Sequence, residues 1–406
     1  MVEQVVIRGA GAVSALGYEA GAAAYAPGGP TFVERVFSPS SSPSPPGGAV
    51  PVAALPAATD ADVAALRAEA ALRPLDRAAL LGVAAARRAV AAAGWQGAEV
   101  PIAVGIGSSR GATGRLEDAF AGFLAGGRTA PTTSPLTTPG NLAAAVAHDL
   151  EAHDGVASAA VSHSSTCSSA VQALGTAVAW LRAGLADRYL AGGTEAPLTA
   201  FTVAQLRAVG IYSPLAAEAW PCRPGAAEAT GSDTFVLGEG AAVFALERAV
   251  PHVGDAVLAG VGFGFERAAS RTGITPDGQH FQRAMRQALA LAGRMPADVD
   301  AVILHAPGTR AGDTAELAAV RAVFGAHRPA LLSNKWLLGH TLGAAGALNL
   351  DFALWLLRYP LVPAPAPSYA GFLTSPGITP PRPRRCILLN AAGFGGNAAS
   401  VLVETL

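Results

Sequence analysis

Two pairs of segments in this chain resemble one another, and this repetition constrains the fold more than any other feature. The segment LGEGAAVFALE, Leu237–Glu247, resembles FGGNAASVLVE, Phe394–Glu404: in each, a glycine turn enters a strand of small and β-branched residues that ends on glutamate. The segment VLAGVGFGFE, which begins at Val257, likewise resembles VVIRGAGAV near the N-terminus. Two similarities in the same order favour duplication over chance recurrence of a glycine-then-strand pattern. We therefore predict two related halves, residues 1–250 and 251–406.

Apolar strands alternate with long alanine-rich helices along the whole chain. The pattern predicts a helical region over residues 60–93, divided at Pro74 and ending at Gly94, followed by a buried strand in VPIAVGIGSSRG. The Ser-, Pro- and Gly-rich segment 31–56 is predicted to be a surface loop. The alternation predicts an α/β layered fold.

Charge and hydropathy exclude several classes of protein. The net charge is −1, so no uniform field draws the chain to nucleic acid or to an anionic membrane. Mean hydropathy is +0.36, yet the longest stretch without Asp, Glu, Lys or Arg, Val156–Leu181, carries many hydroxyl residues near its middle, unlike a lipid-facing helix. The three cysteines form no CxxC pair, and the N-terminus lacks the layout of a signal peptide. We expect no metal site, no membrane span and a cytoplasmic location.

Cys167 stands between a β-prone run and a helical run in VSHSSTCSSAVQALG. A thiol there would meet the free amides and the positive end of a helix, which favour the reactive thiolate. The alternative is a small buried structural residue. We adopt that second interpretation for Cys222 and Cys386.

Two histidines follow predicted strands in the second half. His305 ends the apolar run DAVIL, and Lys335 and His340 flank a turn in LLSNKWLLGHT. An α/β fold presents catalytic side chains at such strand ends, so a cysteine with two strand-end histidines forms a candidate nucleophile set. The other histidines are interpreted as ordinary core or surface residues: His148, His153, His163, His252, His280 and His327.

Motifs along essentially the whole chain resemble the decarboxylating β-ketoacyl-acyl-carrier-protein synthases, a branch of the thiolase superfamily that includes synthase II and the polyketide ketosynthases. They are VVIRGAGAVSALG, DRAALLGVAAARRAVAAAG, STCSSA, AGGTEA, GEGAA, HAPGT, NKWLLGHTLGAAG and NAAGFGGNAA. The resemblance implies a thiolase-like fold, a duplicated five-layered α-β-α-β-α arrangement. It also implies an acyltransferase that joins malonyl-carrier protein to an enzyme-bound acyl group by decarboxylative Claisen condensation.

The resemblance assigns a role to each member of the candidate nucleophile set. Cys167 would accept the acyl group from a carrier-protein thioester. His305 and His340 would bind the malonyl thioester, assist loss of its carboxylate and stabilise the enolate, as neutral imidazoles that donate from Nε2. Lys335 would order the two histidines and the water beside them.

The C-terminal glycine loop has a role by the same resemblance. The backbone amides of Cys167 and Phe394 would form the oxyanion hole, where loss of one donor typically costs about 100-fold in rate or more. Gly393 and Gly395 would belong to this gating loop. Thr309 and Ala392 would lie at the substrate and phosphopantetheine site.

Three departures from the family pattern bear on these roles. In HAPGT, Ala306 and Pro307 replace Gly and Thr of HGTGT, which removes one hydroxyl. Ala392 replaces a Phe of the gating loop, so its motion or the room beside the nucleophile should differ. Asn349 stands where many members carry a Glu that supports the lysine. HAPGT and NKWLLGHT are similar to ketosynthases of specialised polyene pathways.

The resemblance also implies partners. The substrates would be thioesters of the phosphopantetheine group of acyl carrier protein, and no separate cofactor is expected. A strand at about Ala157–Ser162 would pair across a two-fold interface, either with a second copy or with a chain-length-factor-like subunit. Two alternatives stay open: a non-catalytic partner that controls chain length, although such proteins usually lack the cysteine, and an acyltransferase or thioesterase on the same fold.

Overall fold

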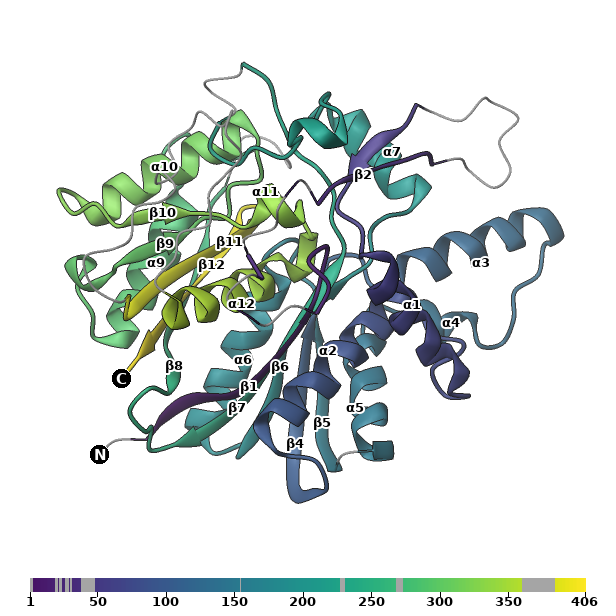
Figure 1. The fold of residues 1–406 in the computed structure, drawn as a ribbon, viewed down its shortest axis with the longest axis horizontal. Helices are drawn as coiled ribbons and strands as arrows, with labels where there is room; N and C mark the ends of the chain where they lie inside the picture. The colour runs from purple at the N-terminus through teal and green to yellow at the C-terminus, as the bar shows by residue number, and fades with distance from the viewer. Residues whose placement is uncertain are drawn as a thin grey trace.

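The strands of the computed structural model form one large mixed sheet and a small hairpin (Figure 1). The structure describes residues 3–18, 21, 24–25, 29, 31–37, 48–153, 155–226, 231–267, 273–359 and 384–406. The large sheet has the order β10-β9-β11-β12-β8-β1-β7-β6-β4-β5. Its strands are β1 (Gln4–Val13), β4 (Ala98–Gly107), β5 (Gly155–His163), β6 (Arg188–Glu195), β7 (Gly240–Ala249), β8 (Ala256–Phe265), β9 (Ala301–Ile303), β10 (Ala330–Leu332), β11 (Cys386–Gly393) and β12 (Asn397–Thr405).

The sheet consists of two five-stranded halves with the same topology. In the N-terminal half, β7 pairs antiparallel with β1 on one side and β6 on the other, and β6, β4 and β5 then run parallel to one another. In the C-terminal half, β12 pairs antiparallel with β8 and β11 in the same way, and β11, β9 and β10 run parallel to one another. The two halves meet at β1 and β8 through the pair Val6–Val257. The repeated sequences fall on equivalent strands, β7 with β12 and β1 with β8. The predicted duplicated fold is thus confirmed, while the boundary between residues 250 and 251 stays a prediction.

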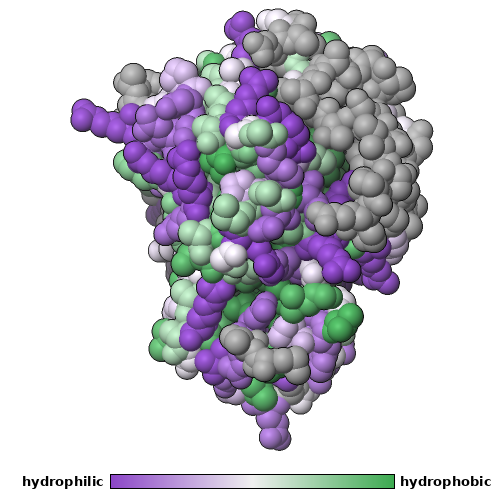
Figure 2. All heavy atoms as spheres, turned by 90° about the vertical axis from the view of Figure 1, so that its left-hand side faces the viewer, coloured by the Kyte–Doolittle hydropathy of each residue, from purple (hydrophilic) through white to green (hydrophobic). Residues whose placement is uncertain are grey.

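Helices cover both halves of the sheet in layers (Figure 1). α2 (Arg77–Ala93) and α5 (Asn141–His153) pack on the outer face of the N-terminal half, and α9 (Gln279–Ala292) and α10 (Arg310–Phe324) lie on the outer side of the C-terminal half. Between the halves lie α6 (Ser169–Ala183) and α12 (Ala345–Arg358), inside the largest apolar cluster. Figure 2 shows the side on which α9 and α10 lie, where hydrophilic side chains predominate.

Glycines explain why the first strands of the two halves resemble each other. A Cβ at Gly11 of β1 would lie 2.6 Å from the Cβ of Arg88 on α2, and one at Gly262 of β8 would lie 2.5 Å from the nitrogen of Ala288 on α9. Both contacts are too short for any side chain. The repeated glycines are therefore required for the outer helices to pack directly on these strands.

The local predictions largely agree with the structure. α1 (Ala57–Ala65) and α2 lie on either side of Pro74, and α2 ends at Gly94, whose φ of 66° closes the helix. Segment 31–56 is not simply a loop, because β2 (Val33–Arg35) pairs with β3 (Val50–Val52); residues 38–47 lie outside the described part. Within the described residues, the other helices are α3 (Thr113–Gly126), α4 (Thr133–Thr137), α7 (Ala200–Val209), α11 (Lys335–Leu338) and the 3₁₀ turns Leu66–Ala68, Ala217–Ala219, Pro296–Asp298 and Leu342–Ala344.

The uncharged stretch Val156–Leu181 is divided between β5, a turn and the buried helix α6. Among the described helices, none has both the length and the apolar character needed to cross a bilayer.

Candidate active site

A strained turn presents Cys167 between β5 and α6. Thr166 has a φ of 50°, in the left-handed region that a β-branched residue rarely adopts. Hydrogen bonds hold the turn: the amide of Ser168 donates to the carbonyl of Ser165, and the Oγ of Ser169 accepts from the amide of Ser165 at 2.9 Å. The turn places the thiol just before the first residues of α6. Such a geometry exposes a nucleophile where backbone amides converge.

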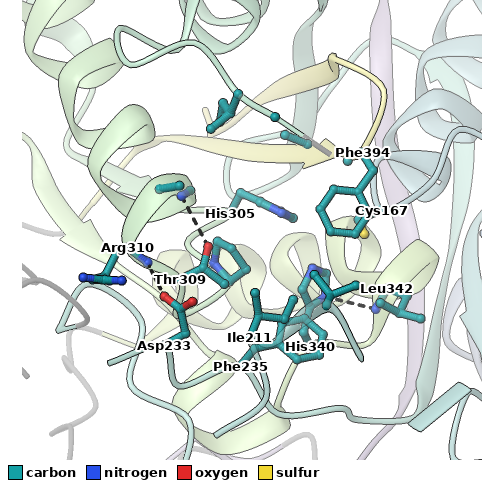
Figure 3. A pocket seen from close by; sticks show the side chains of 18 of the residues that line it. Cys167, Ile211, Asp233, Phe235, His305, Thr309, Arg310, His340, Leu342 and Phe394 are labelled. Carbon is teal, nitrogen blue, oxygen red and sulfur yellow. Dashed lines mark hydrogen bonds between the residues drawn. The ribbon is translucent and has the colours of Figure 1, made fainter. Parts of the chain in front are cut away.

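The ends of several strands bring the predicted residues to one cavity of about 490 Å³. Cys167 follows β5, His305 follows β9, His340 follows β10 and the short α11, and Phe394 connects β11 to β12. Figure 3 shows these four side chains facing the same space. Thr309, Ala392 and Gly393 also line this cavity, whereas Gly396 lines it in place of the predicted Gly395. The structure thus brings most of the candidate residues together, while their roles remain predictions.

His305 is held by a buried carboxylate that the sequence analysis missed. Both oxygens of Glu316 accept backbone N–H groups, from His305 at 2.8 Å and from Ala306 at 2.7 Å. The side-chain amide of Asn390 donates to the same carboxylate at 2.9 Å. Burial, assisted by the charge of Lys335, moves the pKa of His305 well below its usual value. The imidazole is therefore neutral at physiological pH.

His340 has a defined tautomer. Its Nδ1 accepts the backbone N–H of Leu342 at 3.1 Å, so a neutral ring carries its proton on Nε2. Burial holds the pKa of His340 well below its usual value. Its amide donates to the carbonyl of Val236 at 2.7 Å, and its ring centroid lies 5.1 Å from that of His305. The predicted Nε2 donor thus follows from the hydrogen bond to Nδ1.

Lys335 is fully buried and does not line the cavity, but its charge acts on both histidines. Burial lowers its pKa, and the charge of Glu316 opposes that shift. No described residue forms a hydrogen bond with its Nζ. Asn349, which replaces the expected Glu, instead donates its side-chain amide to the carbonyl of Asn390 at 3.3 Å. Glu316 is therefore the main carboxylate that acts on the lysine.

The electrostatic prediction for Cys167, a thiolate favoured by the helix end, is wrong. Burial and the carboxylate of Glu195 raise the pKa of the thiol to about 12, although Lys335 and Arg110 lower it. Glu195 accepts backbone N–H groups of Ser109 at 2.7 Å and Gly343 at 2.8 Å, so its charge is fixed near the nucleophile. Loss of hydration outweighs the helix end here. The resting nucleophile is a thiol.

The raised pKa predicts the pH dependence of alkylation. The iodoacetamide reaction of Cys167 should accelerate about tenfold per pH unit from pH 7 to pH 10, because only the thiolate reacts and its fraction keeps increasing below the pKa. A free thiol, with a pKa of about 8.5, would level off within this range. Peptide mass spectrometry of the folded protein measures the rate at this residue. A plateau anywhere between pH 7 and pH 10 would contradict the prediction.

The hairpin between β11 and β12 lies directly against the nucleophile. A Cβ at Gly393 would lie 2.7 Å from the nitrogen of Cys167, so the hairpin reaches the nucleophile turn only without a side chain there. The carbonyl of Phe394 accepts from the Oγ1 of Thr166 at 3.3 Å. In Figure 3 the partly exposed ring of Phe394 lies beside the sulfur. This placement fits the predicted gating role.

The cavity has a polar wall at the start of α10. The Oγ1 of Thr309 caps this helix by accepting the amide of Gly312 at 3.3 Å, and Asp233 accepts the amide of Arg310 at 2.8 Å (Figure 3). Pro307, where a hydroxyl was expected, lines the cavity with its ring. The hydroxyl of Thr309 can still donate its proton to a ligand.

Four residues that shape this site could not be picked out from the sequence. Glu195 and Glu316 stand within the motif segments AGGTEA and GDTAE, but a carboxylate there has no distinctive spacing. The ring of Phe235 lies 5.3 Å from that of His340. His280 was interpreted as an ordinary histidine, yet it lines the cavity. No local signal marks it, because only the packing of α9 on β8 brings it there.

One group of described residues has ligand atoms close enough for a metal, all within 4.8 Å of one another: Glu69, Asp149 and His153. Arg87 already donates to both carboxylates, at 2.8 Å to Glu69 and 2.8 Å to Asp149. The guanidinium offsets one of the two negative charges and occupies the carboxylate oxygens that a cation would need.

Comparisons with known proteins agree with this geometry. Residues 35–252 match the family model for the N-terminal domain of beta-ketoacyl synthase, and residues 255–367 match the model for its C-terminal domain. A Streptomyces cyaneus protein described as a polyketide beta-ketoacyl synthase is 33% identical over 353 residues, 81% of this chain and 82% of that protein. The 3-oxoacyl-acyl-carrier-protein synthase 2 of Rhizobium meliloti is 32% identical over 348 residues, 82% of each chain. The crystal structure of a beta-ketoacyl synthase from Burkholderia phymatum covers 100% of both chains, with 25% identity and a TM-score of 0.81.

Proposed function

The chain belongs to the β-ketoacyl synthase family, and we propose that its Cys167, His305 and His340 carry out decarboxylative condensation in this cavity. The observation that carries the proposal is the convergence of a thiol and two neutral imidazoles on one cavity of about 490 Å³. A thiol supplies the acyl acceptor, and neutral N–H donors supply stabilisation for a developing enolate.

The first half-reaction is an exchange of thioesters. The sulfur of Cys167 attacks the carbonyl of an acyl-carrier thioester, and the amides of Cys167 and Phe394 stabilise the tetrahedral oxyanion. The carrier thiolate then leaves and takes up the proton that the cysteine gave up. Because burial raises the pKa of the thiol to about 12, the cysteine holds this proton at neutral pH and gives it up during the exchange.

The second half-reaction removes carbon dioxide and forms a carbon–carbon bond. Cleavage of the bond to the malonyl carboxylate leaves its electron pair in an enolate, whose oxygen accepts hydrogen bonds from His340 Nε2 and from His305. The enolate carbon attacks the acyl carbonyl on Cys167. Collapse expels the cysteine thiolate, which recovers a proton, and the 3-oxoacyl product stays on the carrier.

Apolar side chains line much of the cavity, which fits an acyl chain or a pantetheine arm. They include Leu206, Val209, Ile211, Phe235 and Leu342. We propose acyl carrier protein as the partner that delivers both substrates, without a separate cofactor, in the cytoplasm and in a polyketide or fatty-acid-like pathway.

The test of this function is a complete reaction. Purified protein, acyl-carrier protein and malonyl-carrier protein should yield carbon dioxide and 3-oxoacyl-carrier protein in equal amounts. Mass spectrometry of the carrier identifies the 3-oxoacyl product. Loss of the acyl group without condensation would instead favour the thioesterase alternative. A protein that neither loads nor condenses would favour the non-catalytic partner, against which the presence of Cys167 counts.

We also propose that β5 pairs with a second subunit. It ends the large sheet, and its residues alternate between exposed and half-buried positions. Such an unpaired edge is a template for another strand. A solved structure with the same fold is titled as the ishigamide ketosynthase/chain length factor, with a TM-score of 0.81 and 23% identity.

Ala160→Asp should therefore dissociate the dimer. Ala160 is exposed on β5, so in a dimer of two copies the substitution would bring two like charges to the strand pair, where they are destabilising. Sedimentation velocity should show a monomer for this variant and a dimer for the matched control Val253→Asp, whose residue is fully exposed away from β5. An unchanged dimer would place the interface elsewhere.

A further inference from the structure

Two separate apolar clusters form walls of the active-site cavity. Cys167 packs against the first cluster, whose Phe235 and Leu342 line the cavity. Phe281 and Ala392 belong to the second cluster and also line the cavity. The acyl chain or the pantetheine arm of the proposed reaction fits along the first wall. The second wall has no role in the mechanism described above.

Each of the two imidazoles lies beside a phenylalanine of one wall. The ring centroid of Phe235 lies 5.3 Å from that of His340, and the centroid of Phe281 lies 6.3 Å from that of His305. The centroids of the two imidazoles are 5.1 Å apart. The four rings therefore form a row, and Phe281 stands at its His305 end.

The ring of Phe281 is held rigidly. Phe281 is the third residue of α9, and its side chain is buried. The amide of His280 donates to Oε2 of Glu266 at 3.1 Å, and a Cβ at Gly264 of β8 would overlap the carbonyl oxygen of His280. This end of α9 is therefore fixed directly on the sheet. A close-packed interior offers such a ring no space into which to withdraw.

Ala392 provides the space that Phe281 fills. Ala392 lies on β11, is 4% exposed, and belongs to a strand on which α9 packs. The family pattern has a phenylalanine at this position of the C-terminal loop. Exchanges that conserve volume are tolerated best in a packed core. In this chain the large side chain of the second wall comes from a helix instead of from the loop.

The position of the second wall bears on the malonyl group. In the proposed second half-reaction, the enolate oxygen lies at the two imidazoles and the enolate carbon faces the sulfur of Cys167. A substituent on that carbon is excluded from the Cys167 side by the acyl group, and Phe235 closes the side of His340. The side that remains is that of His305, which Phe281 closes.

We propose that Phe281 is a specificity-determining residue that excludes malonyl thioesters with a substituent on C2. The inference rests on the proposed function and deepens it, because it names unsubstituted malonyl thioester as the extender. A 2-methylmalonyl thioester would lose carbon dioxide and give a 2-methyl-3-oxoacyl product by the same steps. Its methyl group would overlap the ring of Phe281.

The test compares malonyl-carrier protein with 2-methylmalonyl-carrier protein on the acylated enzyme. Mass spectrometry of the carrier distinguishes the two products, and the readout is the ratio of the two kcat/KM values. Wild type should prefer malonyl about tenfold or more, which is the usual scale for one methyl group in an apolar pocket. Phe281→Ala should raise the methylmalonyl-to-malonyl ratio about tenfold. Adding Ala392→Phe to that variant returns a ring to the wall and should restore most of the preference.

A matched control separates this role from a packing defect. Phe324 belongs to the same apolar cluster and is 4% exposed, but it does not line the cavity. Phe324→Ala removes the same side chain and should leave the ratio as in wild type. If Phe281→Ala does not fold, Phe281→Leu repeats the comparison with a smaller change in volume and a smaller rise in the ratio.

The outcomes distinguish the inference from the proposed function. Equal use of both extenders by wild type would overturn the inference, and so would an unchanged ratio in an active Phe281→Ala variant. An equal rise in Phe324→Ala would also overturn it. Wild type that forms no 3-oxoacyl product from malonyl-carrier protein would instead overturn the proposed function.

Discussion

Cys167→Ala should abolish acyl loading and reduce condensation by about 10³-fold or more, because the variant has no atom that can form the thioester. Malonyl decarboxylation should survive, since His305 and His340 act on the malonyl group and need no covalent intermediate. Intact-protein mass spectrometry after incubation with acyl-carrier protein measures loading, and carbon dioxide release measures decarboxylation. Loss of acyl loading with retention of malonyl decarboxylation would show that Cys167 acts in the first step and the histidines in the second.

A matched control is available in the same chain. Cys386 begins β11 and is buried away from the cavity, so Cys386→Ala makes the same chemical change without touching the site. It should load and condense like the wild type. An acyl adduct that persists on Cys167→Ala, or one that disappears in Cys386→Ala, would contradict the assignment of the nucleophile.

The sequence was sufficient to locate the site because its residues stand at strand ends. Cys167, His305 and His340 each follow a recognisable apolar run, and the strand ends of the two halves meet at one cavity. The glycine repeats of β1 and β8 likewise predicted the duplication, since glycine is required wherever an outer helix packs on these strands.

The electrostatics of the site could not be predicted in the same way. The pKa of Cys167 depends on how completely Gly393 and its hairpin exclude water, and on Glu195, which is 28 residues further along the chain and reaches the site through the end of β6. His280 reaches the cavity only because α9 packs on β8. The local sequence predicts a helix end near the thiol, which would lower its pKa. It does not predict the burial that raises the pKa by a larger amount.

His340→Leu should lower the rate of malonyl decarboxylation by about 10²- to 10³-fold, the usual cost of one lost donor to a developing oxyanion. Loading of Cys167 should continue, because that step uses the backbone amides instead. His340→Gln places an amide N–H near the former position of Nε2 and should recover a large part of the rate. The exposed His148→Leu serves as the control.

The pH profile distinguishes a neutral donor from an imidazolium. Burial holds the pKa of His340 well below 6.5, so its ring is neutral from pH 6.5 to pH 8 and keeps its Nε2 proton throughout. Wild-type decarboxylation should therefore stay level across that range. A charged donor would behave oppositely, because the imidazolium is lost as pH rises through its pKa. A rate that falls across this window would contradict a neutral donor. An equal loss in His340→Gln and His340→Leu would show that the ring acts by shape rather than by donation.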